Sequence, residues 1–328
     1  MSYLAIDIGA TWIRIGIADK KGIFIDKEKT RTIKKGTKEI FLNSITDAIS
    51  GLMKKTKIRR VVAIGIGSIG PIDISRGTIA KPPNIEIHDI PIVKYLSEYF
   101  NVPTYLVNDC TAAVIAEKYF GQCREFSNIV YITLSSGIGG GAIVDNTVLF
   151  GKDGNAVEIG HFVVDIEGKI KCGCGGYGHW EAYTSGANIH KFVKLLIETK
   201  YGESINESPL SKIIERRNIK YEDIFECASR GDKIALDILE EVGRINAVGF
   251  ADVINAFDPE AIMVGGSIAL KNPKHLVFDP IVKNVGKYAI NRVPKIDLTG
   301  LGDDVVLYGA LAIAMNPDII PARFRISP

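Results

Sequence analysis

The sequence contains little cysteine, tryptophan, methionine or glutamine. Two of its five cysteines, Cys172 and Cys174, lie close together, and the other three are scattered: Cys110, Cys123 and Cys227. An odd, irregularly spaced set does not indicate a disulfide framework, so a reducing cytoplasm is the expected location. Glutamine occurs once, at Gln122, while Ile, Lys and Glu are abundant, a bias typical of proteins from hot habitats and equally of AT-rich genomes.

The sequence also lacks a long hydrophobic run and an excess of either charge. No segment approaches the roughly 20 apolar residues that are needed to cross a bilayer. The first apolar segment, Tyr3 to Ile8, is too short for a signal peptide and contains Asp7. A net charge of +2 gives no general basis for binding nucleic acid. We therefore expect neither a membrane nor a nucleic acid as partner, and 328 residues predict one large or two ordinary globular domains.

Apolar periodicity predicts a mixture of strands and helices. The predicted strands are a hairpin over 4–19, then 22–32, 61–66, 104–107, 128–134 and 261–264. The predicted helices are 37–55, 92–100, 110–120, 187–200, 221–230 and 233–256. The segment 305–312 is expected to run from a strand into a helix.

The segment between Asn155 and Tyr183 carries an unusual concentration of metal-binding side chains. Two thiols and two imidazoles could complete a tetrahedral zinc site with no position left for water, which is typical of structural zinc. The four candidate ligands are His161, Cys172, Cys174 and His179. Glycines at 173, 175, 176 and 178 allow a tight loop, and the loop would present Glu158 and Glu181 to a polar ligand. A redox-active cysteine pair and a turn without metal remain alternatives.

Glycine-rich turns recur at places where a nucleotide could bind. In the first hairpin, Gly9 lets the backbone approach a phosphate, Thr11 offers a hydroxyl and Asp7 could hold hydrated Mg²⁺; a plain hairpin is the alternative. The segment 135–144 contains Gly137, Gly139 and Gly140 and could surround phosphate oxygens, although it is neither a Walker loop nor a Rossmann fingerprint. A tight glycine hairpin without a ligand is the alternative. Gly265 and Gly266 follow a predicted strand, where they suit the ribose and base of a nucleotide or a simple turn into a helix.

Polar residues also follow two predicted strands. The strand 61–66 leads into a glycine-rich segment that contains Gly70, and ligands of α/β proteins bind at such strand ends. Prolines before Asn84 could hold its amide rigidly, or could serve loop rigidity alone. Asp109 follows the strand 104–107, where it could act as a helix N-cap or as a general base.

The order of these motifs resembles the ROK family of sugar kinases, repressors and open reading frames. The motifs are Asp-Ile-Gly-Ala-Thr at 7–11, Gly-Ile-Gly-Ser-Ile-Gly-Pro-Ile-Asp at 65–73, Asn-Asp at 108–109, Ser-Ser-Gly-Ile-Gly-Gly-Gly at 135–141, Glu-Ile-Gly-His at 158–161 and the Cys-X-Cys-Gly loop. The resemblance spans nearly the whole chain. It implies an α/β protein with the duplicated ribonuclease H-like fold of actin and hexokinase, in two lobes with a cleft between them. We expect a small N-terminal domain over 1–108, rejoined by 308–328, and a large domain over 109–307 that carries the zinc loop.

The resemblance also implies a role for each matched residue. Asp109 would be the catalytic base that takes a proton from a sugar hydroxyl as the hydroxyl attacks the γ-phosphate of ATP. The implied sugar ligands are Gly70, Asn84, Asn108, Asp109, Glu158, His161 and Glu181, with His161 also on zinc. The implied phosphate and magnesium region comprises Asp7, Gly9, Thr11, Gly137, Gly139 and Gly140, and the nucleoside would lie at Gly265 and Gly266. Relatives are commonly dimers or tetramers, so a homodimer or homotetramer is expected.

The sequence departs from the family pattern at several positions. His179 stands where the family loop usually has a third cysteine, Trp12 and Arg14 stand where small or lysine-like residues are common, and the usual tryptophan after Asn84 is absent. ATP-dependent phosphorylation of a hexose at the 6-hydroxyl, with glucose as the sugar, is the leading prediction. N-acetylglucosamine or N-acetylmannosamine kinase, fructokinase, a zinc scaffold and a non-catalytic sugar sensor are the alternatives. ROK repressors carry a helix-turn-helix before the kinase fold, and we expect none here because the first kinase strand begins at Tyr3.

Overall fold

The computed structural model of the chain describes residues 1–82 and 85–325. Packing divides the chain into two compact units. The first unit comprises Met1–Ile129, Gly141–Val157 and Thr299–Pro328, and the second comprises Val130–Gly140 and Glu158–Leu298. Among the helices of the described ranges, none combines the length and hydrophobicity that crossing a bilayer requires.

The two large sheets repeat one arrangement of strands, as the sequence predicted. The first sheet has the order β3-β2-β1-β4-β7 and the second β10-β9-β8-β11-β12. The strands of the first are β1 (Ser2–Ile8), β2 (Trp12–Asp19), β3 (Phe24–Arg31), β4 (Ile64–Ser68) and β7 (Thr104–Asn108). Those of the second are β8 (Ile129–Leu134), β9 (Ile138–Val144), β10 (Thr147–Val148), β11 (Ala261–Gly265) and β12 (Lys295–Leu298). A small pair, β5 (Ile72–Asp73) and β6 (Thr78–Ile79), completes the strands.

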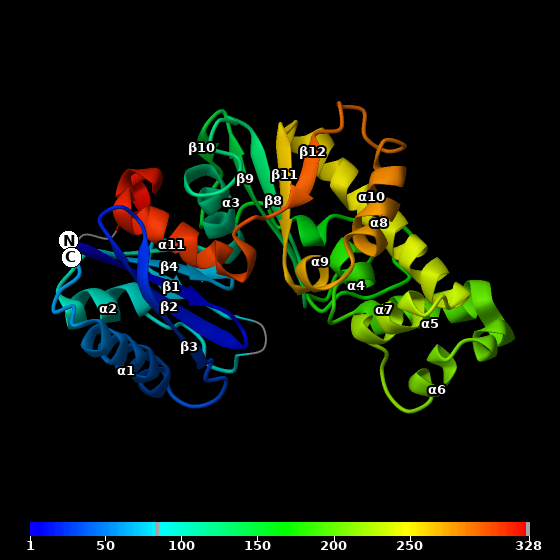
Figure 1. Cartoon of the computed structure of the whole chain (residues 1–328), viewed down its shortest axis with the longest axis horizontal. Coiled ribbons are helices and arrows are strands. Elements are labelled where there is room, and N and C mark those ends of the chain that lie inside the picture. The colour runs from blue at the N-terminus through cyan, green and yellow to red at the C-terminus, as the bar shows by residue number, and fades with distance from the viewer. Residues whose placement is uncertain (83–84, 326–328) are drawn as a thin grey trace. The chain divides into compact units, whose positions relative to one another are not determined.

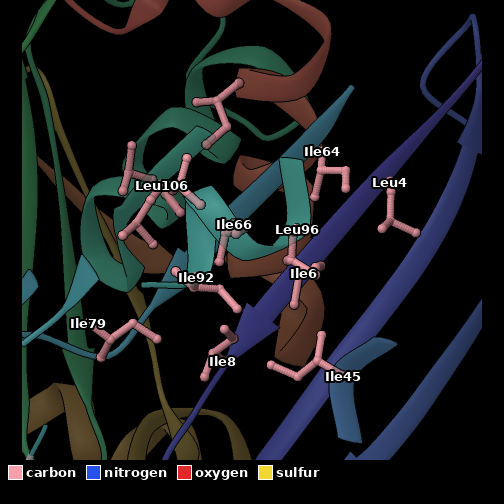
Figure 2. Packing of buried hydrophobic residues seen from close by; sticks show 14 of the residues in the cluster. Leu4, Ile6, Ile8, Ile45, Ile64, Ile66, Ile79, Ile92, Leu96 and Leu106 are labelled. Carbon is pink, nitrogen blue, oxygen red and sulfur yellow. The ribbon is translucent and has the colours of Figure 1, made fainter. Parts of the chain in front are cut away.

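Strand β1 is apolar along most of its length because helices cover both faces of its sheet. Leu4, Ile6 and Ile8 point to one face and pack with side chains from α1 (Lys38–Thr56) and α2 (Ile92–Phe100). Figure 2 shows this cluster, with Ile45, Ile92 and Leu96 beside the strand residues. Ala5 belongs to a separate cluster with residues of α11 (Val305–Met315). The strand therefore follows the pattern of a buried central strand, without polar alternation.

Helix α11 corrects one prediction. The apolar run over 305–312 predicted a strand in its first part, but the structure has helix from Val305 to Met315. Its continuous apolar sequence reflects burial between elements, because α11 contacts β1, β4 and α3 (Asp109–Tyr119) in the first unit (Figure 1). Two glycines permit this packing: a Cβ on Gly65 would lie 1.8 Å from the Ala310 carbonyl oxygen, and one on Gly309 would lie 1.8 Å from that of Ala112.

The second unit is mainly helical. Its α-helices are α4 (Trp180–Thr184), α5 (Ile189–Leu196), α6 (Leu210–Ile214), α7 (Tyr221–Ser229), α8 (Lys233–Phe257), α9 (Ser267–Lys271) and α10 (Lys274–Val285). The long helix α8 confirms the predicted helix over 233–256, and Asp232 caps its start by accepting a hydrogen bond from the Ala235 N–H. Strand β12, with a single apolar alternation over four residues, was not predicted from the sequence.

The units do not coincide with the domain boundary expected at residue 108. Residues 109–129 and 141–157 belong to the first unit, as do those from Thr299 onward. Helix α3 belongs with the first unit because it packs along α11, and a buried hydrogen bond from the Thr299 hydroxyl to Glu117 holds its C-terminal part.

Candidate active site

Four metal-type side chains meet in one loop of the second unit. One ligand atom from each of His161, Cys172, Cys174 and His179 lies within 4.8 Å of every other. Cys174 Sγ lies 3.3 Å from His179 Nδ1, and the two imidazole centroids are 5.2 Å apart. His161 Nδ1 is buried and has no hydrogen-bond partner within residues 1–82 and 85–325. A buried polar nitrogen without a partner is rare, and this one lies within a set of thiols and imidazoles suited to tetrahedral zinc.

The loop reaches this arrangement through a small antiparallel turn. The Cys172 N–H donates to the Gly176 carbonyl, and the Gly175 N–H donates back to the Cys172 carbonyl. Gly176 is required by close approach, because a Cβ there would lie 2.4 Å from a carbon of the His179 ring. Gly178 has φ of +69°, and a Cβ there would lie 2.0 Å from the Asp165 carbonyl oxygen. The glycines therefore bring His179 against the cysteines, as the sequence of the loop predicted.

Glu181 connects this loop to the glycine-rich hairpin. It lies in α4, and its Oε2 accepts a hydrogen bond of 2.9 Å from the Ile138 N–H at the start of β9. A Cβ on Gly137 would lie 2.7 Å from the same oxygen, so a side chain at 137 would obstruct the carboxylate. Helix α4 is held on α8, since Trp180 Nε1 donates to Asn246 Oδ1 at 2.8 Å. Asn246 is a supporting residue that was not predicted, because a polar residue inside a helix gives no pattern of its own.

Glu158 lies beside the same loop. Burial raises the pKa of its carboxyl, His161 opposes this rise and Glu181 adds to it. Its Oε2 lies 3.7 Å from His161 Nδ1, which is too long for a hydrogen bond. The preceding residue, Val157, has φ of +67°, which is unusual for a β-branched side chain. The structure thus brings Glu158 and Glu181 together in one unit, beside His161 and the other three metal-type donors.

The other predicted glycines of the second unit lie in strands or directly beside them. Gly139 and Gly140 are in β9, and Gly137 is in the turn before it, so the predicted strand-turn-strand is confirmed. Gly266 has φ of +88°, and a Cβ there would lie 2.4 Å from the Leu134 carbonyl oxygen. Gly265 is equally restricted, because a Cβ would lie 2.1 Å from the Tyr131 hydroxyl. The hydroxyls of Ser135 and Ser267 are 3.1 Å apart, which places the two glycine turns next to each other.

In the first unit, Asn108 and Asp109 lie where β7 ends and α3 begins, and they differ in their contacts. Asn108 is the N-cap of α3, and its Oδ1 accepts from the N–H groups of Cys110 and Thr111. Asp109 is the first helical residue and is half-buried, so the capping alternative for Asp109 is wrong. A Cβ on Gly70 would lie 3.0 Å from Asn108 Nδ2, which places the glycine-rich segment after β4 next to this amide.

Asn155 holds the segment that contains Gly70. Its Oδ1 accepts from the Ile72 N–H at 3.0 Å, and its Nδ2 donates to the Ile72 carbonyl at 2.8 Å. The side chain amide thus pairs with the backbone as a neighbouring strand would. In the sequence Asn155 only marked the start of a motif, and this role was not predicted because the contact joins residues 83 positions apart.

Asp7 lies in the same unit with Arg14 against it. Arg14 Nη1 is 2.8 Å from Asp7 Oδ2. Burial raises the pKa of Asp7 to about 7 against the effect of Arg14, and the charges of Asp109 and Asp304 add to the rise. The Gly9 N–H donates to the Trp12 carbonyl, and the Thr32 hydroxyl donates to the Gly9 carbonyl, so a tight turn holds Gly9 and Thr11 beyond β1.

The predicted residues therefore fall into two sets. Those described in the first unit are Asp7, Gly9, Thr11, Gly70, Asn108 and Asp109. Those in the second are Gly137, Gly139, Gly140, Glu158, His161, Cys172, Cys174, His179, Glu181, Gly265 and Gly266. Asn84, predicted as a sugar ligand, lies outside the described residues.

Comparison with known proteins gives these residues a family. The model of the ROK family matches residues 3–316. A glucokinase from Pyrobaculum calidifontis is 38% identical over 318 residues, which cover 95% of this chain and 94% of the relative. A xylose repressor from Caldicellulosiruptor bescii is 28% identical over 324 residues, which make up 96% of this chain and 78% of the repressor.

Solved structures agree in fold. A ROK hexokinase from Thermus thermophilus superimposes with a TM-score of 0.80 at 29% identity, over 96% of this chain and 98% of the hexokinase. A ROK family glucokinase from Streptomyces griseus, in complex with glucose and AMPPNP, superimposes with a TM-score of 0.76 at 30% identity. The superposition covers 96% of this chain and 99% of the glucokinase. The predicted α/β fold of sugar kinases is thus confirmed. With a family model over residues 3–316 and these relatives over nearly its whole length, the chain belongs to the ROK family.

Proposed function

We propose that this chain is an ATP-dependent glucokinase that transfers the γ-phosphoryl group of ATP to the 6-hydroxyl of glucose. The observation that carries the proposal is the 38% identity with a glucokinase along 95% of the chain. The Streptomyces griseus relative binds glucose and AMPPNP, which supports the same substrates here. The local geometry of the predicted residues adds chemical support.

Asp109 is proposed as the general base. Asn108 already satisfies the first N–H groups of α3, so the Asp109 carboxylate is not needed as the cap. The first turn of a helix favours negative charge, which suits a carboxylate that must accept a proton. The base would take the proton of the sugar hydroxyl as its oxygen attacks phosphorus.

The sugar would be bound by acids, an imidazole and an amide. Glu158, His161 and Glu181 lie together in the second unit, and a carboxylate can accept hydrogen bonds from two hydroxyls at once. Asn108 keeps its Nδ2 donor because the Oδ1 atom is the capping group. Gly70 lies beside that donor, and Asn84 is retained as a proposed ligand from the family pattern.

The nucleotide would lie on glycine-rich backbone. Gly137, Gly139 and Gly140 are proposed at the phosphates, and Gly265 and Gly266 at the nucleoside, because the two turns are adjacent at Ser135 and Ser267. Asp7, with Gly9 and Thr11, is proposed near a hydrated Mg²⁺ that would offset phosphate charge. Asp7 would have to be ionised for this role, which a nearby cation would favour.

The Cys172 loop is proposed to hold a structural zinc ion. His161, Cys172, Cys174 and His179 supply four ligands and would leave no position for a reacting water. The ion would fix His161 and the following helix α4, and through them Glu181. We also propose a cytoplasmic homodimer or homotetramer, which analytical ultracentrifugation would test.

A sugar panel tests the proposed activity. Purified protein is assayed with ATP and Mg²⁺ against glucose, mannose, fructose, N-acetylglucosamine and N-acetylmannosamine, and the product of glucose is located by phosphorus NMR. We expect the highest kcat/KM for glucose and a 6-phosphate. A preference for an N-acetylhexosamine would favour that alternative, and binding of sugar without phosphorylation would favour a sensor of the kind that xylose repressors represent.

A further inference from the structure

The second unit contains a cavity whose wall is almost entirely separate from the residues proposed above for glucose and ATP. The cavity has a volume of about 770 Å³ and lies between the start of the Cys172 loop, α5 and the segment 214–219. Of the residues assigned above to sugar, nucleotide or metal, only Cys172 contributes to its wall. This volume is in the range that small-molecule sites occupy.

The wall of the cavity is strongly basic. Its cationic side chains are Lys169, Lys171, Lys191, Lys194 and Arg217, and they face a single acidic lining residue, Glu198. Helical spacing accounts for part of this cluster, because Lys191 and Lys194 are one turn apart on α5. Three of the cations have partners: Lys169 pairs with Glu167 at 2.7 Å, Arg217 with Asp223 at 2.6 Å, and Lys194 lies 3.9 Å from Glu198.

Lys171 and Lys191 differ from these three. Among the described residues, no carboxylate lies within ion-pair distance of either ammonium group. Lys191 Nζ donates to the Lys171 carbonyl oxygen at 3.2 Å, and Lys171 Nζ lies 5.6 Å from the centre of the Tyr177 ring. Lys171 and Lys191 thus both line the cavity, and the described residues supply neither with a counter-charge. Such an arrangement attracts an anion with two or more negative oxygens.

The cavity is also lined by apolar side chains, which restrict the kind of ligand further. Leu195, Ile197 and Ile214 line the cavity and are partly exposed, with the buried Ile170, Val193 and Ile219 beside them. An inorganic anion would satisfy the ammonium groups but would leave this apolar surface uncovered. We propose that the cavity binds a small organic phosphate, with its phosphate on Lys171 and Lys191 and its carbon skeleton on the apolar side chains. The site is separate from the proposed sugar and nucleotide residues, so its ligand would be an effector. Cys172 lines the cavity and also belongs to the proposed zinc site, so it joins the two sites.

Binding can be tested with phenyl phosphate, which joins a phosphate monoester to an apolar ring. The full chain is titrated calorimetrically in the presence of glucose, Mg²⁺ and one equivalent of AMPPNP, so that the proposed catalytic residues are already occupied. We expect one saturable site for phenyl phosphate, with at least tenfold weaker binding of inorganic phosphate and of phenol. If the chain does not bind AMPPNP, which would count against the proposed kinase activity, the titration without it still tests this site.

Charge reversal locates the site. Lys191→Glu should weaken phenyl phosphate at least tenfold, and the milder Lys191→Gln should weaken it severalfold. The matched control is Lys233→Glu, which changes the net charge equally on an exposed lysine of the same unit outside the cavity. Equal affinity in wild type and both Lys191 variants, or no saturable binding to the wild type, would overturn the proposal. Unchanged thermal unfolding of Lys191→Gln would show that its loss of binding does not come from unfolding.

Discussion

Asp109 and Asn108 are neighbours in sequence with different tasks. The Asn108 side chain caps α3, while Asp109 Oδ1 accepts from the Cys110 N–H at 2.8 Å. Asp109→Asn keeps an oxygen for that bond and removes the proton acceptor. We expect kcat to fall roughly 10²- to 10⁴-fold, the usual contribution of a general base, with glucose affinity nearly unchanged. A coupled ADP assay and fluorescence titration with glucose measure the two quantities.

The matched control for this variant is Asp47→Asn, the same change at an exposed aspartate of α1 in the same unit, which should keep its turnover. Retained turnover in Asp109→Asn would remove Asp109 from the base role.

Val157 is a residue whose backbone conformation should affect the stability of the chain. Its φ of +67° is costly for a β-branched side chain, by roughly 1–3 kcal/mol, and glycine adopts it freely. Against this gain, the greater backbone freedom of glycine in the unfolded chain lowers the stability by about 0.5–1 kcal/mol. Val157→Gly should therefore increase the free energy of unfolding by about 1 kcal/mol, as measured by urea denaturation.

The control is Val282→Gly, at an exposed position inside α10, where the free energy of unfolding should fall by roughly 0.3–0.5 kcal/mol because glycine is a poorer helix former than valine. A loss of stability in both variants would mean that position 157 carries no strain.

At the scale of elements, the Cys172 loop should depend on metal. We expect about one zinc per chain by elemental analysis. Cys174→Ser should remove most of the zinc and lower Tm by roughly 5 °C or more, since a structural ion contributes directly to folding. Cys227→Ser changes a buried cysteine outside the cluster and should keep its zinc. A metal-free wild type with full activity would disprove the structural role.

The attachment of α3 should depend on pH. Burial raises the pKa of Glu117, which accepts hydrogen bonds from the Thr299 hydroxyl and the Gln122 N–H. The Glu117 carboxyl therefore keeps its proton to a higher pH in the folded chain than in the unfolded chain. Its contribution to stability is complete below the ordinary pKa of 4.5 and is lost as the pH rises through the raised value.

Glu117→Gln cannot titrate, so the wild type should lose stability relative to this variant as the pH rises from about 4.5, in urea denaturation at several pH values. A difference that is independent of pH would show that Glu117 does not titrate in this range.

Across the whole molecule, local patterns predicted most elements and some of the candidate site. The hairpin of β1 and β2, the strands β7, β8 and β11, and the helices α1, α3, α7 and α8 were found because each has an apolar periodicity of its own. The four donors of the Cys172 loop were found because they are near in sequence and chemically distinctive.

What the sequence did not reveal depends on distant contacts. The helical state of Val305 and its neighbours follows from packing on β1 and α3, which local preference for β-branched residues contradicts. Asn155 acts on Ile72 from 83 positions away, and Asn246 supports α4 from 66 positions away. The cap of α3 was assigned to Asp109 as one alternative because neighbouring Asn and Asp are both good caps.

The three-segment composition of the first unit has a consequence for biosynthesis. Its central sheet is complete once residue 108 has been made, yet α11, which covers Ala5 and fits against Gly65, comes from the last thirty residues. On the ribosome, this sheet must wait with one apolar face uncovered while the entire second unit emerges. A nascent chain in that state offers a surface to chaperones and to other nascent chains, so any premature stop codon before residue 305 yields a product that lacks its final layer.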